Sequence, residues 1–496
     1  MKKINYIVFI VFFQLFGHYS LSQWLTGAIS NTLSKSNKKG AKKTPNTLQL
    51  GQIADTYTNL LEFNPVISQS DTASEGYPLE VLGVVNSNYF AYFDQSFFTS
   101  KIRLVKYDSS LKKVASVFIF EGKENDPQES NFEEIVTFGN QLYIFTTQYT
   151  KEANGSYSQK LYAEFINSNI LKKEEKKLIS TKSTLSKVKN IYFFKLSPDS
   201  SQLAIINFND TETKNLITGN IKVVNTQFDI IWESSLELPY SFSNFDTDVK
   251  GVELKMKLEK DASFNILTPD NNFYRYTALN KEKKITISGT SEKVFNGVQF
   301  YSTGKQIVFT GLFSNKNNTD SVQGSFYYRY NISADSFDIT RLEKDSLISD
   351  DTFFVNNLIT TEDAGSILLL KKEVVDKYPQ KGASPYLYQD VVVLKRNLQG
   401  NTEWEIKVPS SEYRDNNDLM SFYNNRMLYI TFNTKDNTYL TAITDNGKVV
   451  QSKAIWYNKF YQLSFDKSGG QHGKIVFYAN KVSNSPVKIY AFVRIL

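Results

Sequence analysis

The feature that most constrains the fold is a repeated pattern of short extended segments joined by tight turns, seen most completely in residues 353–433. There an extended segment enters a turn at 362–365, and an apolar run returns from it. Residues 390–395 then lead outward, residues 398–401 form a second turn, and residues 403–408 return with alternating polar and apolar side chains. Glycine occupies turn positions where a positive φ is least costly. Four antiparallel strands of this kind are typical of one blade of a β-propeller.

The same unit recurs along most of the chain. Each copy contains an apolar strand that follows a polar turn, and then a hairpin whose second arm is often rich in lysine. The starts of eight such units lie roughly 35 to 70 residues apart, which suits propeller blades with loops of variable length. They begin near residues 82, 133, 193, 264, 298, 353, 421 and 462. Because the unit from 264 is short, we predict an all-β protein, a β-propeller of seven or eight four-stranded blades over residues 81–496.

The last unit is followed by one outgoing strand, VKIYAFVRIL, so the final blade lacks an outer strand. We expect an N-terminal strand from residues 66–82 to complete that blade and close the ring, because closure removes the free edges through which sheets aggregate. Two stacked or tandem β-sandwiches are the main alternative, and the evenness of the hairpin pattern argues against them. A parallel β-helix is disfavoured because its rungs are shorter and more regular.

Residues 1–22 have the pattern of a secretory signal peptide. Lys2 and Lys3 give a basic start, residues 7–16 form an apolar core too short for a membrane span, and Ser20-Leu21-Ser22 supplies small residues for cleavage. An uncleaved N-terminal anchor is the alternative. The chain contains no cysteine, which excludes a lipid anchor on cysteine and stabilising disulfides. We expect an exported protein with no transmembrane span in its mature chain, in the periplasm or at the cell surface, or held peripherally at the outer membrane.

Residues 23–47 form a polar segment with five lysines and no acidic residue. We expect a flexible basic arm, which is either a tether to anionic head groups or an acidic partner, or simply a solvated linker. Residues 48–80 are predicted to hold a short helix and the ring-closing segment. Subtracting the seven lysines before Asn46 from the formal charge of +6 leaves about −1 for the remaining chain. That balance gives no basic surface for nucleic acid.

Three stretches of the sequence carry a resemblance to other proteins. The runs TTEDAGSILLLKKE (360–373), QDVVVLKRNLQGNTEWEIKVP (389–409) and NNRMLYITFN (424–433) resemble uncharacterised secreted β-propeller proteins of the Bacteroidetes phylum. The run SPDSSQLAI (197–205) is similar to the S-P-D-G turn of many extracytoplasmic propellers, with Ser200 in place of the usual glycine. The resemblance implies a fold and a compartment, and it implies no particular activity.

Composition leaves little room for histidine chemistry. The chain has two histidines, His18 and His472, and only the second lies outside the expected signal peptide. His472 belongs to the glycine-rich turn 468–473, where a catalytic base would be poorly positioned and turn formation explains the residues. Zinc and copper sites built from histidine and cysteine are ruled out. The sequence therefore predicts no catalytic, cofactor-binding or metal-binding residue, and no cofactor.

Carboxylates are the remaining candidates for chemistry. Glycosidases use paired acids, and three adjacent pairs are the candidates: Glu133-Glu134, Asp350-Asp351 and Glu362-Asp363. Calcium prefers oxygen ligands, which the turns at 436–437, 445–447 and 466–469 offer without the spacing of an EF-hand. All these groups lie beside turns, where acidic side chains are common and solvated, so turn formation is the simpler interpretation.

Two aromatic runs, 273–276 and 326–330, place rings on both sides of a strand with an arginine between them. Such rings either form a face on which sugars stack or pack between blades, and packing is the interpretation we favour. Taken together, the sequence predicts a non-catalytic exported propeller that is a binding scaffold or accessory subunit of an envelope protein complex. A glycan- or small-ligand-binding module and a carboxylate-dependent glycan hydrolase are the alternatives.

Overall fold

The computed structural model describes a β-sheet protein. The described residues are 68–69, 77–94, 101–109, 112–122, 130–184, 192–209, 216–239, 254–279, 282–345, 347–348, 351–375, 386–408, 419–424, 426–433, 438–456, 460–465, 474–481 and 489–494. Their regular secondary structure consists of strands β1 to β32. Within these ranges no helix is long and apolar enough to cross a membrane. The expected signal peptide, basic arm and short helix (1–63) lie outside the described residues and stay predictions.

Seven four-stranded antiparallel sheets are built from strands that follow one another in the chain. The first three contain β2 (Tyr77–Val85), β3 (Asn88–Asp94), β4 (Lys101–Tyr107) and β5 (Lys113–Glu121); β6 (Ser130–Phe138), β7 (Gln141–Lys151), β8 (Tyr157–Asn167) and β9 (Lys172–Thr184); and β10 (Tyr192–Leu196), β11 (Gln202–Phe208), β12 (Leu216–Asn225) and β13 (Ile230–Pro239).

The next four contain β14 (Lys255–Leu258), β15 (Phe264–Leu267), β16 (Asn272–Tyr276) and β17 (Lys283–Thr286); β18 (Lys293–Ser302), β19 (Gln306–Asn315), β20 (Asn318–Asn331) and β21 (Ser336–Glu343); β22 (Phe353–Thr360), β23 (Ser366–Val375), β24 (Tyr386–Arg396) and β25 (Thr402–Val408); and β26 (Met420–Asn424), β27 (Met427–Asn433), β28 (Thr438–Thr444) and β29 (Val449–Trp456). The short unit predicted from residue 264 is therefore a complete sheet, whose strands have four or five residues.

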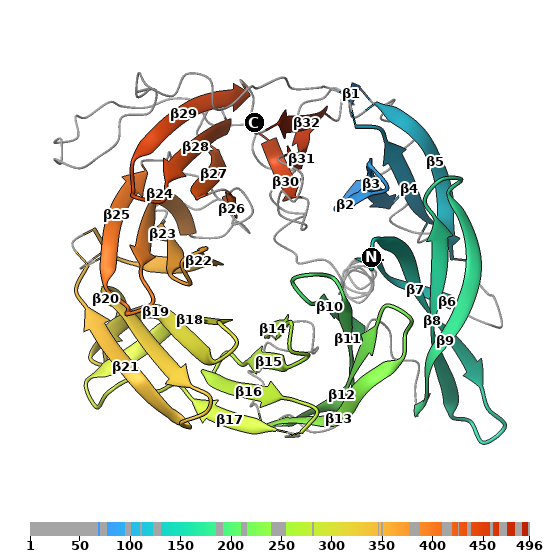
Figure 1. Ribbon diagram of the computed structural model, residues 1–496, viewed down its shortest axis with the longest axis horizontal. Coiled ribbons are helices and arrows are strands. Elements are labelled where there is room, and N and C mark those ends of the chain that lie inside the picture. Colours follow the sequence, from blue (N-terminus) through green and yellow to red (C-terminus); the bar gives the residue numbers. More distant parts are fainter. Residues whose placement is uncertain are drawn as a thin grey trace, which may run out of the picture.

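Neighbouring sheets touch through their first strands. β2 contacts β6, β6 contacts β10, β10 contacts β14, β18 contacts β22, and β22 contacts β26. Figure 1 shows the sheets placed side by side around a common centre in chain order, each running outward from its first strand. Radial sheets of four antiparallel strands are the architecture of a β-propeller, which confirms the predicted fold.

An eighth sheet has a different strand order. It contains β30 (Phe460–Phe465), β31 (Lys474–Lys481), β32 (Ile489–Arg494) and then β1 (Ser68–Gln69). β1 pairs with β32 through Ser68 opposite Tyr490 and Gln69 opposite Ile489. The strand that joins the C-terminal sheet thus comes from the N-terminal segment in which we expected it. Closure of the whole ring and the number of blades stay predictions.

The core lies between adjacent sheets. One cluster joins Phe208 of β11 and Trp232 of β13 to Phe264 of β15 and Tyr274 of β16. Burying a side chain of this size contributes about 1.5–3 kcal/mol. Second strands such as β19 are buried along almost their whole length, because both their faces meet a neighbouring sheet, whereas the outermost strand β21 alternates between exposed and half-buried residues.

Several hairpin turns share one residue pattern. A serine or threonine begins the turn, an aspartate or asparagine follows two residues later, and the next residue has a positive φ. In the turn after β10, the Ser197 and Ser201 hydroxyls donate to Asp199 at 2.7 and 2.8 Å, and these bonds lower the pKa of Asp199 to about 2. Ser200 takes φ = +54° where related turns have glycine. The turn therefore forms without glycine because the aspartate holds it.

Candidate functional site

One side of the molecule is made of hairpin turns, and we call it the turn face. Because strands alternate in direction, the turn between the first and second strands of a sheet lies on the same side as the turn between the third and fourth. Across the described residues, the turn face therefore carries two turns from each sheet whose turns are described. It is the surface on which loops from all these sheets are presented together.

Side chains of one sheet donate hydrogen bonds to turn carbonyls of the next. Trp232 Nε1 donates to the Ala262 carbonyl at 2.8 Å, and Trp404 Nε1 donates to the Asp445 carbonyl at 2.8 Å. Tyr327 donates through its hydroxyl to the Leu398 carbonyl, also at 2.8 Å. These bonds satisfy carbonyls at the turn tips and couple each turn to its neighbour. The turn face is consequently held in place by contacts between sheets.

Two of these turns press a glycine against an aromatic ring. A Cβ atom added to Gly400 would lie 2.4 Å from Cδ1 of Tyr327, and one added to Gly447 would lie 2.6 Å from Cγ of Trp404. Both glycines also have positive φ values, +76° and +80°. Glycine is needed at these two positions for its conformation and for its lack of a side chain.

A cleft of about 630 Å³ opens on the turn face between the sheet of β22–β25 and the sheet of β26–β29. Its charged lining contains three acids and three bases: Asp363, Glu403, Asp445, Lys395, Arg426 and Lys448. Trp404, Thr444 and Asn446 complete the walls. Asp363 comes from the turn after β22, Glu403 and Trp404 from the start of β25, and the remaining acid from the turn after β28.

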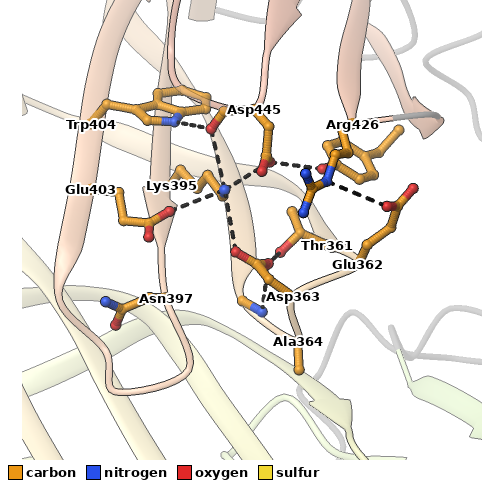
Figure 2. A network of polar contacts seen from close by, with 12 residues as sticks. Thr361, Glu362, Asp363, Ala364, Lys395, Asn397, Glu403, Trp404, Arg426 and Asp445 are labelled. Carbon is orange, nitrogen blue, oxygen red and sulfur yellow. Dashed lines mark hydrogen bonds and ion pairs between the residues drawn. The ribbon is translucent and has the colours of Figure 1, made fainter.

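Lys395, near the end of β24, is the centre of this site. Its ammonium lies 2.7 Å from Asp445 Oδ1, 3.0 Å from Glu403 Oε2 and 3.4 Å from Asp363 Oδ2. It also donates to the Asp445 carbonyl at 3.2 Å. The Lys395 side chain is 3% exposed, whereas the three carboxylates are 25–37% exposed. Figure 2 shows the carboxylates arranged around the ammonium.

Two of the three acids also accept hydrogen bonds from other groups. Asp363 Oδ1 accepts from the Thr361 hydroxyl and from the Gly365 N–H at 3.2 Å, and Asp445 Oδ1 accepts from the Tyr423 hydroxyl at 2.7 Å. We call Asp363, Lys395, Glu403, Tyr423 and Asp445 the open cluster. Its members come from two sheets, so the cluster joins those sheets at the turn face.

Burial and charge act in opposite directions on the open cluster. Burial alone would raise the pKa of Asp363, but the hydrogen bonds from Thr361 and Gly365 and the charge of Lys395 outweigh it and lower that pKa. Burial would lower the pKa of Lys395, but the bonds to Asp445 and Glu403 and the nearby negative charges raise it. Burial raises the pKa of Tyr423, and its bond to Asp445 adds to the effect. The charged forms of Asp363 and Lys395 are therefore favoured, and Tyr423 is held in its neutral form.

The next residue, Arg396, forms a second network on the opposite face of β24. Its Nη2 atom lies 2.6 Å from Ser325 Oγ, 3.3 Å from Glu343 Oε2 and 3.9 Å from Asp345 Oδ1. Ser325 also hydrogen-bonds Asp345, and the Thr402 hydroxyl donates to Glu343 at 2.7 Å. We call Ser325, Glu343, Asp345, Arg396 and Thr402 the closed cluster.

The closed cluster contains one fully buried ion pair, Arg396 with Asp345, whereas its second acid, Glu343, is 30% exposed. Arg396 and Asp345 have side chains 3% and 2% exposed. Burial raises the pKa of Asp345, against the bond from Ser325 and the charge of Arg396, and burial lowers the pKa of Arg396. Among the described residues, Arg396 Nη1 has no hydrogen-bond partner. This cluster lies between the sheet of β18–β21 and the sheet of β22–β25, and it lies outside the cleft lining.

The structure brings together some of the candidate residues and separates others. Asp363 and Asp445, which the sequence placed in a candidate acid pair and a candidate calcium turn, meet at Lys395. Glu133 lies in β6 and accepts from the Thr147 hydroxyl at 2.7 Å, and Asp351 pairs with Lys372 at 2.7 Å. In the part of the chain that the structure describes, no three His, Cys, Asp or Glu side chains are grouped to hold a metal ion.

Some candidate residues cannot be placed. His472, Asp350 and the turns at 436–437 and 466–469 lie outside the described residues. The interpretation of the aromatic runs as packing is confirmed: Phe273, Tyr274, Phe326 and Tyr327 are fully buried. Sugar stacking on those four rings is therefore excluded.

Sequence reasoning missed Lys395, Glu403, Trp404 and Arg426 as site residues. One signal was present, because Lys395 is a charged residue that continues the apolar run of β24 at a position expected to be buried. A buried lysine requires acidic partners. Which acids would meet it depends on how two sheets pack, and the spacing of residues along the chain does not show that.

No known family model matches the chain, and no curated protein matches it in sequence. Among solved structures, it is similar to the polysaccharide lyase Uly1, with a TM-score of 0.41 and 10% identity over 86% of this chain and 91% of that one. It is similar to the β-propeller domain of the Trilobed protease from Pyrococcus furiosus, with a TM-score of 0.36 and 12% identity over 73% and 95%.

A third similar structure is a protein of unknown function from Bacteroides caccae, with a TM-score of 0.27 and 9% identity over 62% of this chain and 89% of that one. At these TM-scores and identities the comparisons do not assign the chain to a family or an activity. The description of the chain as a β-propeller rests on its own sheets and their arrangement.

Proposed function

We propose that the protein is an exported, non-catalytic β-propeller that binds a protein partner and acts as a scaffold or accessory subunit of a cell-envelope complex. The observation that carries this proposal is the bonding of turns between sheets, exemplified by Tyr327 to Leu398 and Trp404 to Asp445. A surface fixed before binding loses little conformational entropy when a partner docks. Export is supported by the signal-like pattern of residues 1–22.

The turn face also exposes apolar side chains at its tips. Leu279, between β16 and β17, is 94% exposed, and Ile170, between β8 and β9, is 65% exposed. Apolar side chains on a rigid polar surface are suitable anchors for a protein interface. Substituting these two residues therefore tests whether the turn face binds a partner.

The hydrolase alternative called for convergent carboxylates, and three do converge in the cleft. They converge on the Lys395 ammonium, however, and the pKa of Asp363 is lowered. A glycosidase needs one carboxyl held protonated as the general acid, with a raised pKa. The geometry therefore favours binding over hydrolysis.

The test is affinity purification of the tagged mature protein from its native envelope after gentle detergent extraction. We expect an envelope protein to co-purify in stoichiometric amount, and the double variant Leu279→Ser/Ile170→Ser to lose it. Leu178→Ser is the matched control, since Leu178 is 51% exposed in the middle of the outer strand β9, away from the turns. Recovery of the propeller alone, or equal recovery of the partner with all variants, would contradict the proposed role of the turn face.

A further inference from the structure

Arg426 has an unusual backbone conformation for its residue type. It lies in the tight turn between β26 and β27, where Asn424 pairs with Met427, and its φ is +59°. Glycine, asparagine and aspartate adopt this conformation most readily, and such hairpin turns prefer Asn-Gly. The chain has Asn-Arg instead. The positive φ makes the backbone less favourable at Arg426 than it would be with glycine.

The Arg426 side chain lies at the mouth of the cleft described above. It is 69% exposed, and its Nε atom is 3.7 Å from Glu362 Oε2, which is itself 57% exposed. Figure 2 shows the guanidinium facing Glu362 at the edge of the network. A pair this long and this exposed holds the arginine weakly. Arg426 is therefore available to a ligand, and Lys448 adds a second positive charge to the lining.

The walls of the cleft offer donors and acceptors in similar measure. Glu403 and Asp363 present half-exposed carboxylates, while Arg426, Lys448 and the Asn446 amide supply donors. A hydroxyl group both donates and accepts, so a ligand with several hydroxyls satisfies both kinds of wall. The Trp404 indole gives the cleft one apolar wall, and the volume lies within the range of small-molecule sites.

Charge limits the ligand further. Lys395 offsets one of the three carboxylates around it, so the floor of the cleft remains negative. A polyanion such as a nucleotide would be repelled there, whereas a single anionic group can stay at the mouth with Arg426. Carboxylate and sulfate both match the planar donor pair of a guanidinium.

We propose that this cleft binds an acidic saccharide, whose hydroxyls bond to the walls and whose carboxylate or sulfate pairs with Arg426. The site is separate from the turn tips at Leu279 and Ile170, and the inference goes beyond the proposed protein-binding role without depending on it. Arg426 sets the preference for a negatively charged sugar.

The test is calorimetric titration of the mature protein with four probes: trigalacturonate, neutral galactotriose, sulfated galactotriose and a triglutamate peptide. We expect saturable binding of the uronate or the sulfated sugar, and weaker binding of the neutral one. Arg426→Gly should weaken binding of the charged sugar on the order of tenfold, the value of one charge-assisted hydrogen bond. Its thermal midpoint should equal or exceed that of the wild type, because glycine relieves the positive φ.

Asn140→Gly is the matched control, because Asn140 lies in the corresponding turn between β6 and β7 with φ = +59°. It should leave the binding of every probe unchanged, and Arg426→Asn should repeat the loss seen with glycine. No binding of any saccharide, or unchanged binding by both Arg426 variants, would overturn the proposal. Binding of triglutamate alone would assign the cleft to an acidic peptide instead. The relative affinities of the uronate and the sulfated sugar identify the anionic group.

Discussion

Lys395 and Arg396 are consecutive residues of β24, and they enter two different boundaries between sheets. Lys395 meets three carboxylates that water also reaches, with 25–37% of their side chains exposed. Arg396 meets Asp345, which is 2% exposed. On one side of the strand every acid around the cation is partly exposed, whereas on the other side one acid, Asp345, is sealed from water and only Glu343, at 30% exposed, reaches it.

This difference in exposure determines how much each cluster contributes to the stability of the fold. In the closed cluster, desolvation outweighs the hydrogen bonds and partner charges of Asp345 and Arg396, whereas in the open cluster the partners of Asp363 and Lys395 outweigh it. Removing Arg396 therefore leaves Asp345 buried without its cation. In the open cluster, water can replace a lost partner, so the ions position the turns more than they stabilise the fold. The open boundary is also the one that forms the cleft.

The largest expected effect on stability comes from removing the cation of the closed cluster, with removal of Lys395 as the comparison. Arg396→Met should destabilise the protein by about 3–5 kcal/mol, because Asp345 is left buried without its charge partner. Lys395→Met should cost about 1–2 kcal/mol, since its three acids remain partly hydrated. Denaturant midpoints of the two variants measure the difference. Equal losses would mean that burial does not distinguish the clusters.

A smaller loss of stability is expected when the glycines that contact aromatic rings at the two sheet boundaries are replaced. Gly400→Ala and Gly447→Ala should each cost about 2–4 kcal/mol, from positive φ and from the clash with Tyr327 or Trp404. Gly304→Ala is the control, since its φ is +83° but no atom lies within 4 Å of an added Cβ. Gly304→Ala should cost about 1 kcal/mol, because the positive φ is unfavourable for alanine but no steric clash is added. If all three variants lost the same amount, the ring contacts would be irrelevant to stability.

The smallest expected effect is the change of folding stability with pH. The contributions of Asp363 in the open cluster and Asp345 in the closed cluster should change in opposite directions as the pH falls. Asp363 has a lowered pKa in the folded protein, so its contribution to stability is present above its unfolded pKa of about 3.9 and is lost as the pH falls through the folded value. Asp345 has a raised pKa, so its contribution is fully present below the unfolded value and is lost as the pH rises through the folded one.

Denaturant midpoints between pH 3 and pH 7 check this sign for Asp363→Asn and Asp345→Asn. As the pH falls, the wild type should lose stability relative to Asp363→Asn. Over the same range it should gain stability relative to Asp345→Asn. Shifts in the same direction for both variants would contradict the distinction between an open and a closed cluster.

Much of the fold follows from local pattern. The turn at 362–365, the apolar return of β23 and the alternation of β25 are visible in the sequence because each is set by neighbouring residues. The site is different, because its contacts cross from sheet to sheet. Lys395 meets Asp445, 50 residues away, and Arg396 meets Ser325, 71 residues away. Which side chain of β24 faces which sheet depends on the packing of whole sheets, and spacing along the chain cannot supply it.

The pairing of β1 with β32 has a consequence for how the protein is made. Gln69 lies opposite Ile489, so the last sheet needs a strand from the beginning of the described chain and three strands from its end. The earlier sheets are assembled from neighbouring segments and can fold as they emerge. This one cannot form until residues 489–494 have been synthesised, more than 400 residues after β1, and β1 has no partner strand until then.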